Sequence, residues 1–198
     1  MPTEPGNRRA VVSLGTARGN YGRGLRRLSA SLRRVGFGGE QLLWPPGRFP
    51  AGCPDQLEVP FAFKPFCLAE ATARGIDSLL WLDASCLAIK SLDPLFAAIE
   101  ANGHLLFRNG ARVVGEWASD AALEALSLSR DEAMALPELN AAAIGLSVRH
   151  PVGAAFLDQW LGLARAGVVF RGTREPLTSW EDYRDVKWNR ADRVSTDP

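Results

Sequence analysis

Residues 76–85 read IDSLLWLDAS, and this stretch decides the fold. Ser78-Leu-Leu-Trp-Leu82 is a nearly continuous apolar run of strand length, which is typical of a strand buried on both faces. The run ends on Asp83-Ala-Ser85, and a carboxylate there is costly unless it meets a cation, hydrogen-bond donors or water. The stretch therefore predicts a central strand with polar chemistry at its carboxyl end.

Short strands and helices alternate on both sides of this run. The predicted strands are residues 10–14, 41–44, 78–82, 104–107 and 142–147. The predicted helices are residues 25–35, 65–74, 93–101, 129–136 and 151–166. The first helix has its apolar positions three and four residues apart, and the last has Val152, Phe156, Trp160 and Leu163 on one side. This alternation predicts an α/β fold with a mostly parallel, Rossmann-type sheet flanked by helices.

The chain has the size of one domain. It contains 198 residues, of which 46% are hydrophobic and 23% charged, so it can bury a core. We expect a single domain over residues 1–198 in which residues 167–198 are irregular, because no periodic pattern continues past Gly167.

Charge and cysteine content narrow the class of protein. The net charge is +1, although residues 1–48 carry nine arginines against Glu4 and Glu40. No apolar run approaches the ~18–20 residues of a membrane span, and the N-terminus lacks a secretory apolar region. Three cysteines without Cys-x-x-Cys spacing make a disulfide framework or a zinc ribbon unlikely. We therefore expect a cytoplasmic protein without a transmembrane segment.

Ligands of helix-flanked parallel sheets bind where loops leave the carboxyl ends of the strands. Candidate positions are residues 13–18, 83–86, 108–109 and 147–150. The loop from Gly15 to Gly24 precedes the first helix, where backbone N–H groups attract phosphate. It matches neither the dinucleotide fingerprint nor the P-loop, so a flexible turn with solvated arginines is the alternative.

Several charged residues have two interpretations. Lys64 begins a helix, an unfavourable place for a cation, and either a nearby anion or solvent exposure would explain it. Asp83 either binds a divalent cation such as Mg²⁺ or Mn²⁺, or merely caps the following turn. The arginines of the first helix indicate a solvated face rather than a nucleic-acid interface, because no aromatic residues are interleaved among them. These arginines are Arg26, Arg27, Arg33 and Arg34.

Three segments together resemble the centre of a GT-A glycosyltransferase. They are Lys64-Pro65, then residues 76–85, then Leu92-Asp-Pro-Leu-Phe96. Residues 138–146 and 149–160 are similar to a downstream strand and helix of that superfamily. Residues 115–120, GEWASD, resemble a segment of a bacterial group within it. The likeness covers roughly residues 10–165.

This resemblance implies a nucleotide-diphospho-sugar donor, with the sugar passed to an unidentified acceptor by a transferase of the hexosyltransferase type. The opening loop would hold the nucleoside, and the Asp-x-Asp-like motif would hold a divalent cation, Mn²⁺ or Mg²⁺, on the diphosphate. Donor-binding residues would be Ser13, Gly15, Thr16, Arg18, Lys64, Ser85 and Asn140. The cation ligands would be Asp83 and Ser85, and the catalytic residues Asp83, Glu116 and Asp120.

The sequence departs from the family pattern at two places. Ser85 stands where the second acid of Asp-x-Asp is usual, and hydroxyl oxygen is a poorer metal ligand. The chain also ends at Pro198, about where a His- and Asp-containing segment of the related group begins. We therefore expect a truncated member with weak or absent transfer activity. The alternative is a non-catalytic module that binds a sugar nucleotide, and a nucleic-acid-associated domain is a remote third.

Overall fold

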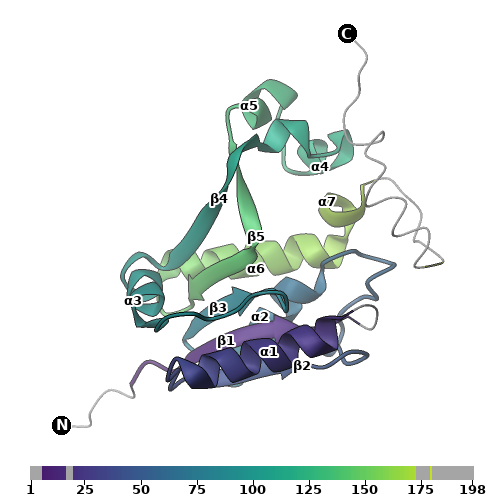
Figure 1. Ribbon diagram of the computed structural model, residues 1–198. Coiled ribbons are helices and arrows are strands. Elements are labelled where there is room, and N and C mark those ends of the chain that lie inside the picture. Colours follow the sequence, from purple (N-terminus) through teal and green to yellow (C-terminus); the bar gives the residue numbers. More distant parts are fainter. Residues whose placement is uncertain (1–5, 17–19, 173–178, 180–198) are drawn as a thin grey trace.

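The computed structural model of the protein describes residues 6–16, 20–172 and 179, and it is an α/β structure (Figure 1). The strands are β1 (Arg9–Leu14), β2 (Glu40–Trp44), β3 (Ser78–Leu82), β4 (His104–Val113) and β5 (Pro137–Ser147). The longer helices are α1 (Tyr21–Arg34), α2 (Phe63–Ala73), α3 (Asp93–Asn102) and α6 (Pro151–Ala166). The shorter ones are η1 (Val114–Glu116), α4 (Asp120–Ala125), α5 (Arg130–Met134) and α7 (Val168–Arg171). All five predicted strands and all five predicted helices are present.

The five strands form one sheet in the order β2-β1-β3-β5-β4. β1 pairs in parallel with both β2 and β3, as predicted. β5 is antiparallel to β3 and to β4, so the sheet is mixed rather than mostly parallel. The physical reason is the path of the chain. After β4 the chain turns back on itself, and β5 then runs antiparallel to β4 in the position between β3 and β4.

Two apolar clusters fill the spaces between the sheet and its helices. On one face, Val11 of β1 and Leu80 of β3 pack against Leu28 of α1 and Phe96 of α3. On the other face, Trp81 of β3 packs with residues of α2 and α6. Successive side chains of β1 and β3 point to opposite faces of the sheet. Because helices cover both faces, these strands are buried on both sides.

β4 and β5 extend well beyond the strands that the sequence predicts. Their pairing continues through Arg108 with Leu139 and Val113 with Pro137, interrupted by irregularities in the register. Residues 108–139, which include η1, α4 and α5, form what we call the arm. Figure 1 shows the arm rising away from the rest of the sheet. Residues 108–109 therefore lie within a strand and not in a loop after one.

The reversed direction of β5 moves one predicted ligand-binding segment to the wrong edge. Ser147 pairs with Ser78, the first residue of β3, so residues 147–150 lie at the amino ends of the parallel strands. His150 there caps α6, because its Nδ1 accepts a hydrogen bond from the backbone N–H of Val152 (3.2 Å). The opposite half of β5, which includes Asn140, lies toward the carboxyl end of β3.

The region after Gly167 is regular at its start. Residues 168–171 form α7, where the sequence predicts irregular chain, and residues 173–178 and 180–198 lie outside the described residues. Among the helices that the structure describes, none combines the length and the apolar character needed to cross a membrane.

Candidate functional site

A hollow of about 470 Å³ opens between the first turns of α1 and the turn that follows β3. Its lining residues are Asn20, Tyr21, Arg23, Gly24, Arg27, Ala84 and Ser85. Its volume lies within the range of small-molecule sites, roughly 300–1,000 Å³. It lies at the carboxyl ends of β1 and β3, the edge where α/β sheets bind ligands. Ser85, predicted from the sequence as a donor-binding residue, is thus part of the hollow.

Gly24 allows α1 to touch the turn after β3. A Cβ atom at Gly24 would lie only 2.3 Å from the backbone oxygen of Ala84, so no larger residue fits without moving the helix or the turn. This contact joins the first helix to the end of the central strand. It explains why a segment near residue 24 and one near residue 85 share a single hollow.

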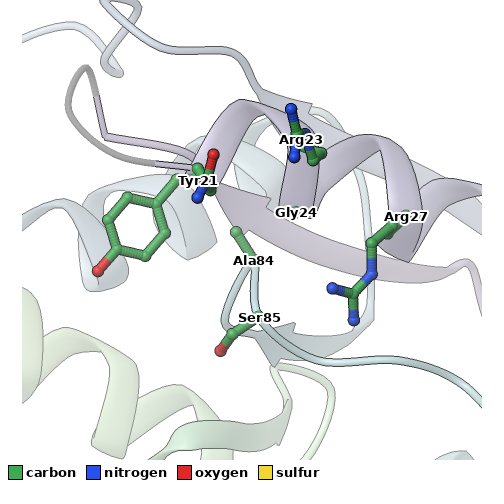
Figure 2. Close-up of a pocket in the computed structure, with 7 residues that line it drawn as sticks. Tyr21, Arg23, Gly24, Arg27, Ala84 and Ser85 are labelled. Atoms are coloured by element: carbon green, nitrogen blue, oxygen red, sulfur yellow. The ribbon is translucent and has the colours of Figure 1, made fainter.

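Two arginines give the hollow a positive charge. Arg23 and Arg27 are exposed, and within the described part of the chain neither forms an ion pair or a side-chain hydrogen bond. Figure 2 shows Arg27 reaching down from the helix toward the level of Ser85, whereas the ring of Tyr21 lies on the other side of Gly24. The Arg27 guanidinium is therefore available to an anion beside Ser85, whereas the Arg23 group lies on the upper side of the helix, exposed at the rim of the hollow.

The position of these arginines on α1 is electrostatically unfavourable without an anion. The first turn of α1 contains no acidic residue, and Arg23 lies where the positive end of the helix dipole repels a cation. Arg23 and Arg27 are also four residues apart, a spacing at which like charges destabilise a helix by about 0.2–0.5 kcal/mol. A bound anion would relieve both repulsions, and backbone N–H groups at a helix N-terminus also favour an anion.

Asp83 meets a cation of the protein itself. The Lys64 Nζ atom lies 2.8 Å from Asp83 Oδ1, and it also donates to the backbone oxygen of Ala141 (2.7 Å). Trp81 Nε1 donates to the same Oδ1 atom (2.7 Å). The Lys64 side chain is only 7% exposed and the Asp83 side chain 35% exposed. Of the two explanations for a lysine at this helix start, the nearby anion is confirmed.

The donor set around Asp83 does not fit a cation held by the protein. One carboxylate oxygen already accepts from Lys64 and Trp81, and a divalent ion beside it would be repelled by the ammonium group. In the described parts of the chain, no three His, Cys, Asp or Glu side chains gather where they would hold a metal ion. Mg²⁺ and Mn²⁺ prefer several oxygen ligands, whereas Asp83 and Ser85 would supply one carboxylate and one hydroxyl. The predicted metal site stays a prediction, and we derive no chemistry from it.

The opening loop is only partly accessible. Ser13 is fully buried, and its hydroxyl lacks a hydrogen-bond partner among residues 6–16 and 20–172. The backbone N–H of Gly15 donates to the oxygen of Trp44 (3.0 Å), which ties the loop to β2. Thr16 is half-buried, and Arg18 lies outside the described residues. The loop thus supports the first turn of α1, and the contacts of the predicted Ser13 are with the core.

Asn140 lies close to the Lys64–Asp83 pair. It is exposed, and its Oδ1 atom accepts from the backbone N–H of Ala142 (2.8 Å). The oxygen of Ala142 in turn accepts from the backbone N–H of Asp83 (2.8 Å). The start of β5 therefore brings this predicted residue to the correct edge of the sheet.

Glu116 and Asp120 belong to the arm, where each has a local partner. Asp120 forms an ion pair with Arg130, which also donates to the backbone oxygens of Gly115 and Ala118. Glu116 accepts a long hydrogen bond (3.5 Å) from the backbone N–H of Val113. Among the described residues, no hydrogen bond or ion pair joins either acid to Asp83. Their catalytic roles remain predictions.

Cys86 is the cysteine closest in sequence to the site, and it is not an activated nucleophile. Burial raises the pKa of its thiol, and the nearby negative charge of Asp83 raises it further. The thiol is therefore protonated at neutral pH.

Sequence reasoning missed Arg23 and Arg27 as ligand-binding candidates, because Arg27 reads as part of a solvated helix face. The sequence did contain a signal for this site. Two arginines lie four residues apart at the beginning of a helix, and the first turn of that helix contains no acidic residue. Sequence reasoning also missed the hydrogen bond between Trp81 and Asp83. Alternate residues of a strand point to the same face, so this contact was open to prediction.

Comparison with models of known protein families finds no match, and comparison with curated proteins finds none either. The geometry of the site therefore carries the functional argument.

Proposed function

We propose that the protein binds a nucleotide-diphospho-sugar in the hollow beside α1 and acts as a GT-A-like glycosyltransferase. The observation that carries this proposal is a hollow at the ligand-binding edge of an α/β sheet, lined by two arginines that have no ion-pair partner in the described part of the chain. The resemblance of residues 64–96 to the centre of GT-A glycosyltransferases supports the same edge of the sheet, because Ser85 belongs to both.

The lining of the hollow suits both parts of a nucleoside diphosphate. Arg23 and Arg27 can form charge-assisted hydrogen bonds with phosphate oxygens, which are stronger than neutral ones. The ring of Tyr21 is 44% exposed and offers a flat apolar surface on which a nucleobase can stack. Phosphates near the arginines and the base near Tyr21 would orient the sugar along the edge of the sheet.

In glycosyl transfer the departing group is a nucleoside diphosphate, on which negative charge develops as the sugar–oxygen bond breaks. Positive groups fixed in advance beside that charge stabilise the transition state. Arg23 and Arg27 would perform this role. Asn140 and the backbone beside it would border the sugar, and the arm with Glu116 and Asp120 would contact the acceptor.

A second candidate function is non-catalytic binding of the same class of ligand. One observation favours it: two of the three acids predicted as catalytic are already ion-paired, Asp83 with Lys64 and Asp120 with Arg130. Carboxylate oxygens in such pairs are already engaged by a cation of the protein, which makes them less available to a substrate. Under this alternative the ligand binds but is neither transferred nor hydrolysed.

Calorimetric titration with UDP-glucose, UDP, GDP-mannose and GDP tests the binding step. We expect saturable binding of at least one nucleotide, and a weaker affinity in Tyr21→Ala without a change in pyrophosphate affinity. Release of nucleoside diphosphate from the sugar nucleotide, followed by chromatography, separates transferase from binding module. No binding of any nucleotide or sugar nucleotide would overturn both candidate functions.

A further inference from the structure

The charges at this edge of the sheet are arranged in two different ways. At the Asp83 side chain, a carboxylate and a buried ammonium are matched at 2.8 Å, so no net charge is offered to a ligand. In the hollow, Arg23 and Arg27 have no acidic partner in the described part of the chain. The net charge of the described side chains at this edge is therefore positive, and it comes from Arg23 and Arg27.

A divalent cation at Asp83 would either displace Lys64 or lie close to its positively charged ammonium group. Lys64 cannot leave easily, because its ammonium is held by Asp83 and Ala141 and lies 5.4 Å from the centre of the Trp81 ring. Removing the Asp83 charge from this ammonium would leave a buried cation uncompensated. The arginines meet no such obstacle, because their guanidinium groups are exposed and unpaired.

We propose that the hollow binds diphosphate through Arg23 and Arg27 without a divalent cation, and that the Lys64–Asp83 pair holds the turn after β3 in place. For a nucleotide ligand this inference rests on the proposed function. As a site for diphosphate it stands on the hollow and its two arginines. The neutralising charge that a metal ion usually supplies to a bound diphosphate would come from α1.

The test is calorimetry with inorganic pyrophosphate, UDP and GDP, each in EDTA and in excess Mn²⁺. We expect pyrophosphate to bind in EDTA with an affinity within about twofold of that in Mn²⁺. The double variant Arg23→Gln/Arg27→Gln keeps helix-forming side chains of similar length and removes both charges. It is expected to weaken pyrophosphate binding by at least tenfold, since charge-assisted hydrogen bonds to phosphate are among the stronger ones.

The matched control is Arg26→Gln/Arg33→Gln, which removes two charges from exposed positions of α1 outside the hollow. This control is expected to change affinity less than threefold, because distant exposed charges are screened by salt. Circular dichroism of each variant checks that α1 is retained. Equal weakening in both double variants would overturn the site and leave only a general charge effect.

Asp83→Asn separates the metal-free site from the metal site that the sequence predicts. If pyrophosphate and nucleotides bind only in Mn²⁺, and Asp83→Asn abolishes that binding, the inference is wrong and the proposed function survives. Metal-free binding of pyrophosphate with no binding of nucleotides or sugar nucleotides supports the arginine site and overturns the proposed function. No binding of any probe under either condition overturns both.

Discussion

The body of the sheet and the arm are built on different physical principles. In β1 and β3 nearly every side chain is buried, and aromatic and aliphatic residues of four helices cover both faces. In the arm, β4 and the first part of β5 are largely exposed. The arm buries only a few apolar residues, such as Leu123 and Ala133, and short polar contacts add to them: the Ser119 cap, the Ser129–Glu132 capping box and the bonds of Arg130.

This difference decides which region can be changed without loss of the fold. Burial of apolar area stabilises the whole domain cooperatively, whereas caps and exposed hydrogen bonds stabilise one turn each. The body positions the hollow, because Gly24 meets the turn after β3 there. None of the residues that line the hollow belongs to the arm, so we expect substitutions in the arm to leave the hollow intact.

The largest expected effect is in the body. Phe96→Ala removes a fully buried ring that stacks on Phe37 (5.5 Å between centroids) and lies under Arg9. We expect a loss of about 3–5 kcal/mol in the free energy of unfolding, measured by urea denaturation. Ile89→Ala, at a 76% exposed position, is the control and should change it by less than about 0.5 kcal/mol. A loss below about 1 kcal/mol for Phe96→Ala would contradict the comparison.

The next effect concerns the ion pair at the edge of the body. Lys64→Met leaves Asp83 without its cation, and it should cost roughly 1–3 kcal/mol, less than for a fully buried pair because Asp83 is partly exposed. Lys64→Met/Asp83→Asn should be more stable than Lys64→Met, because the uncompensated charge is removed. A double-mutant cycle by denaturation measures this coupling, and additive losses would show that the pair contributes nothing.

In the arm, Arg130→Gln should act locally. It removes the ion pair with Asp120 and the hydrogen bonds to the backbone oxygens of Gly115 and Ala118. We expect the free energy of opening the arm to fall by about 1–2 kcal/mol. Hydrogen exchange read by mass spectrometry should quicken over residues 114–136 and stay unchanged in β1 and β3. Faster exchange in β1 would mean that the arm and the body unfold as one unit.

The smallest effect is expected at the start of α5. Ser129→Ala removes a side-chain cap, which typically contributes about 1 kcal/mol to a helix. Hydrogen bonds from Ser129 lower the pKa of the Glu132 carboxyl, so the folded form holds its proton less tightly than the unfolded form. The capping box is therefore fully stabilising above the ordinary glutamate pKa and weakens as the pH falls through the lowered value.

Hydrogen exchange of α5 at falling pH measures this effect, which should be reduced in Ser129→Ala. Asp131→Asn, in the same turn but outside the capping box, is the control. A pH dependence of equal size in wild type and Ser129→Ala would show that the box is not its source.

Much of the body was predictable from local patterns. Residues 78–82 are a buried strand as predicted, and Leu25, Leu28 and Leu32 are buried on α1. The helix predicted over residues 129–136 is present in the arm as α5, which begins with the capping box of Ser129 and Glu132. These features depend on neighbours within one or two turns of the chain, so their signals are complete within a short stretch of sequence.

The apolar side of α6 was predicted only in part: Phe156 and Trp160 pack against the core as half-buried residues, but Val152 does not. Val152 is 49% exposed, and the buried positions are Gly153, Leu157 and Ala164. A Cβ atom at Gly153 would lie 2.2 Å from the backbone oxygen of Ser147, so the helix crosses the chain at this glycine. Hydrophobic spacing alone ranks valine above glycine, and only the close crossing of two backbones reverses the order.

The sequence by itself determined which segments are strands and helices and that Asp83 ends a buried strand, because residue periodicity and turn chemistry are local. The tertiary structure alone decided that β5 runs against its neighbours, that Lys64 neutralises Asp83 and that Arg23, Arg27 and Ser85 line one hollow. Each of these depends on segments between 19 residues (Lys64 to Asp83) and 69 residues (Ser78 to Ser147) apart. Charges so distant in the chain meet only after the apolar layers have packed, and no local pattern records which partner each will find.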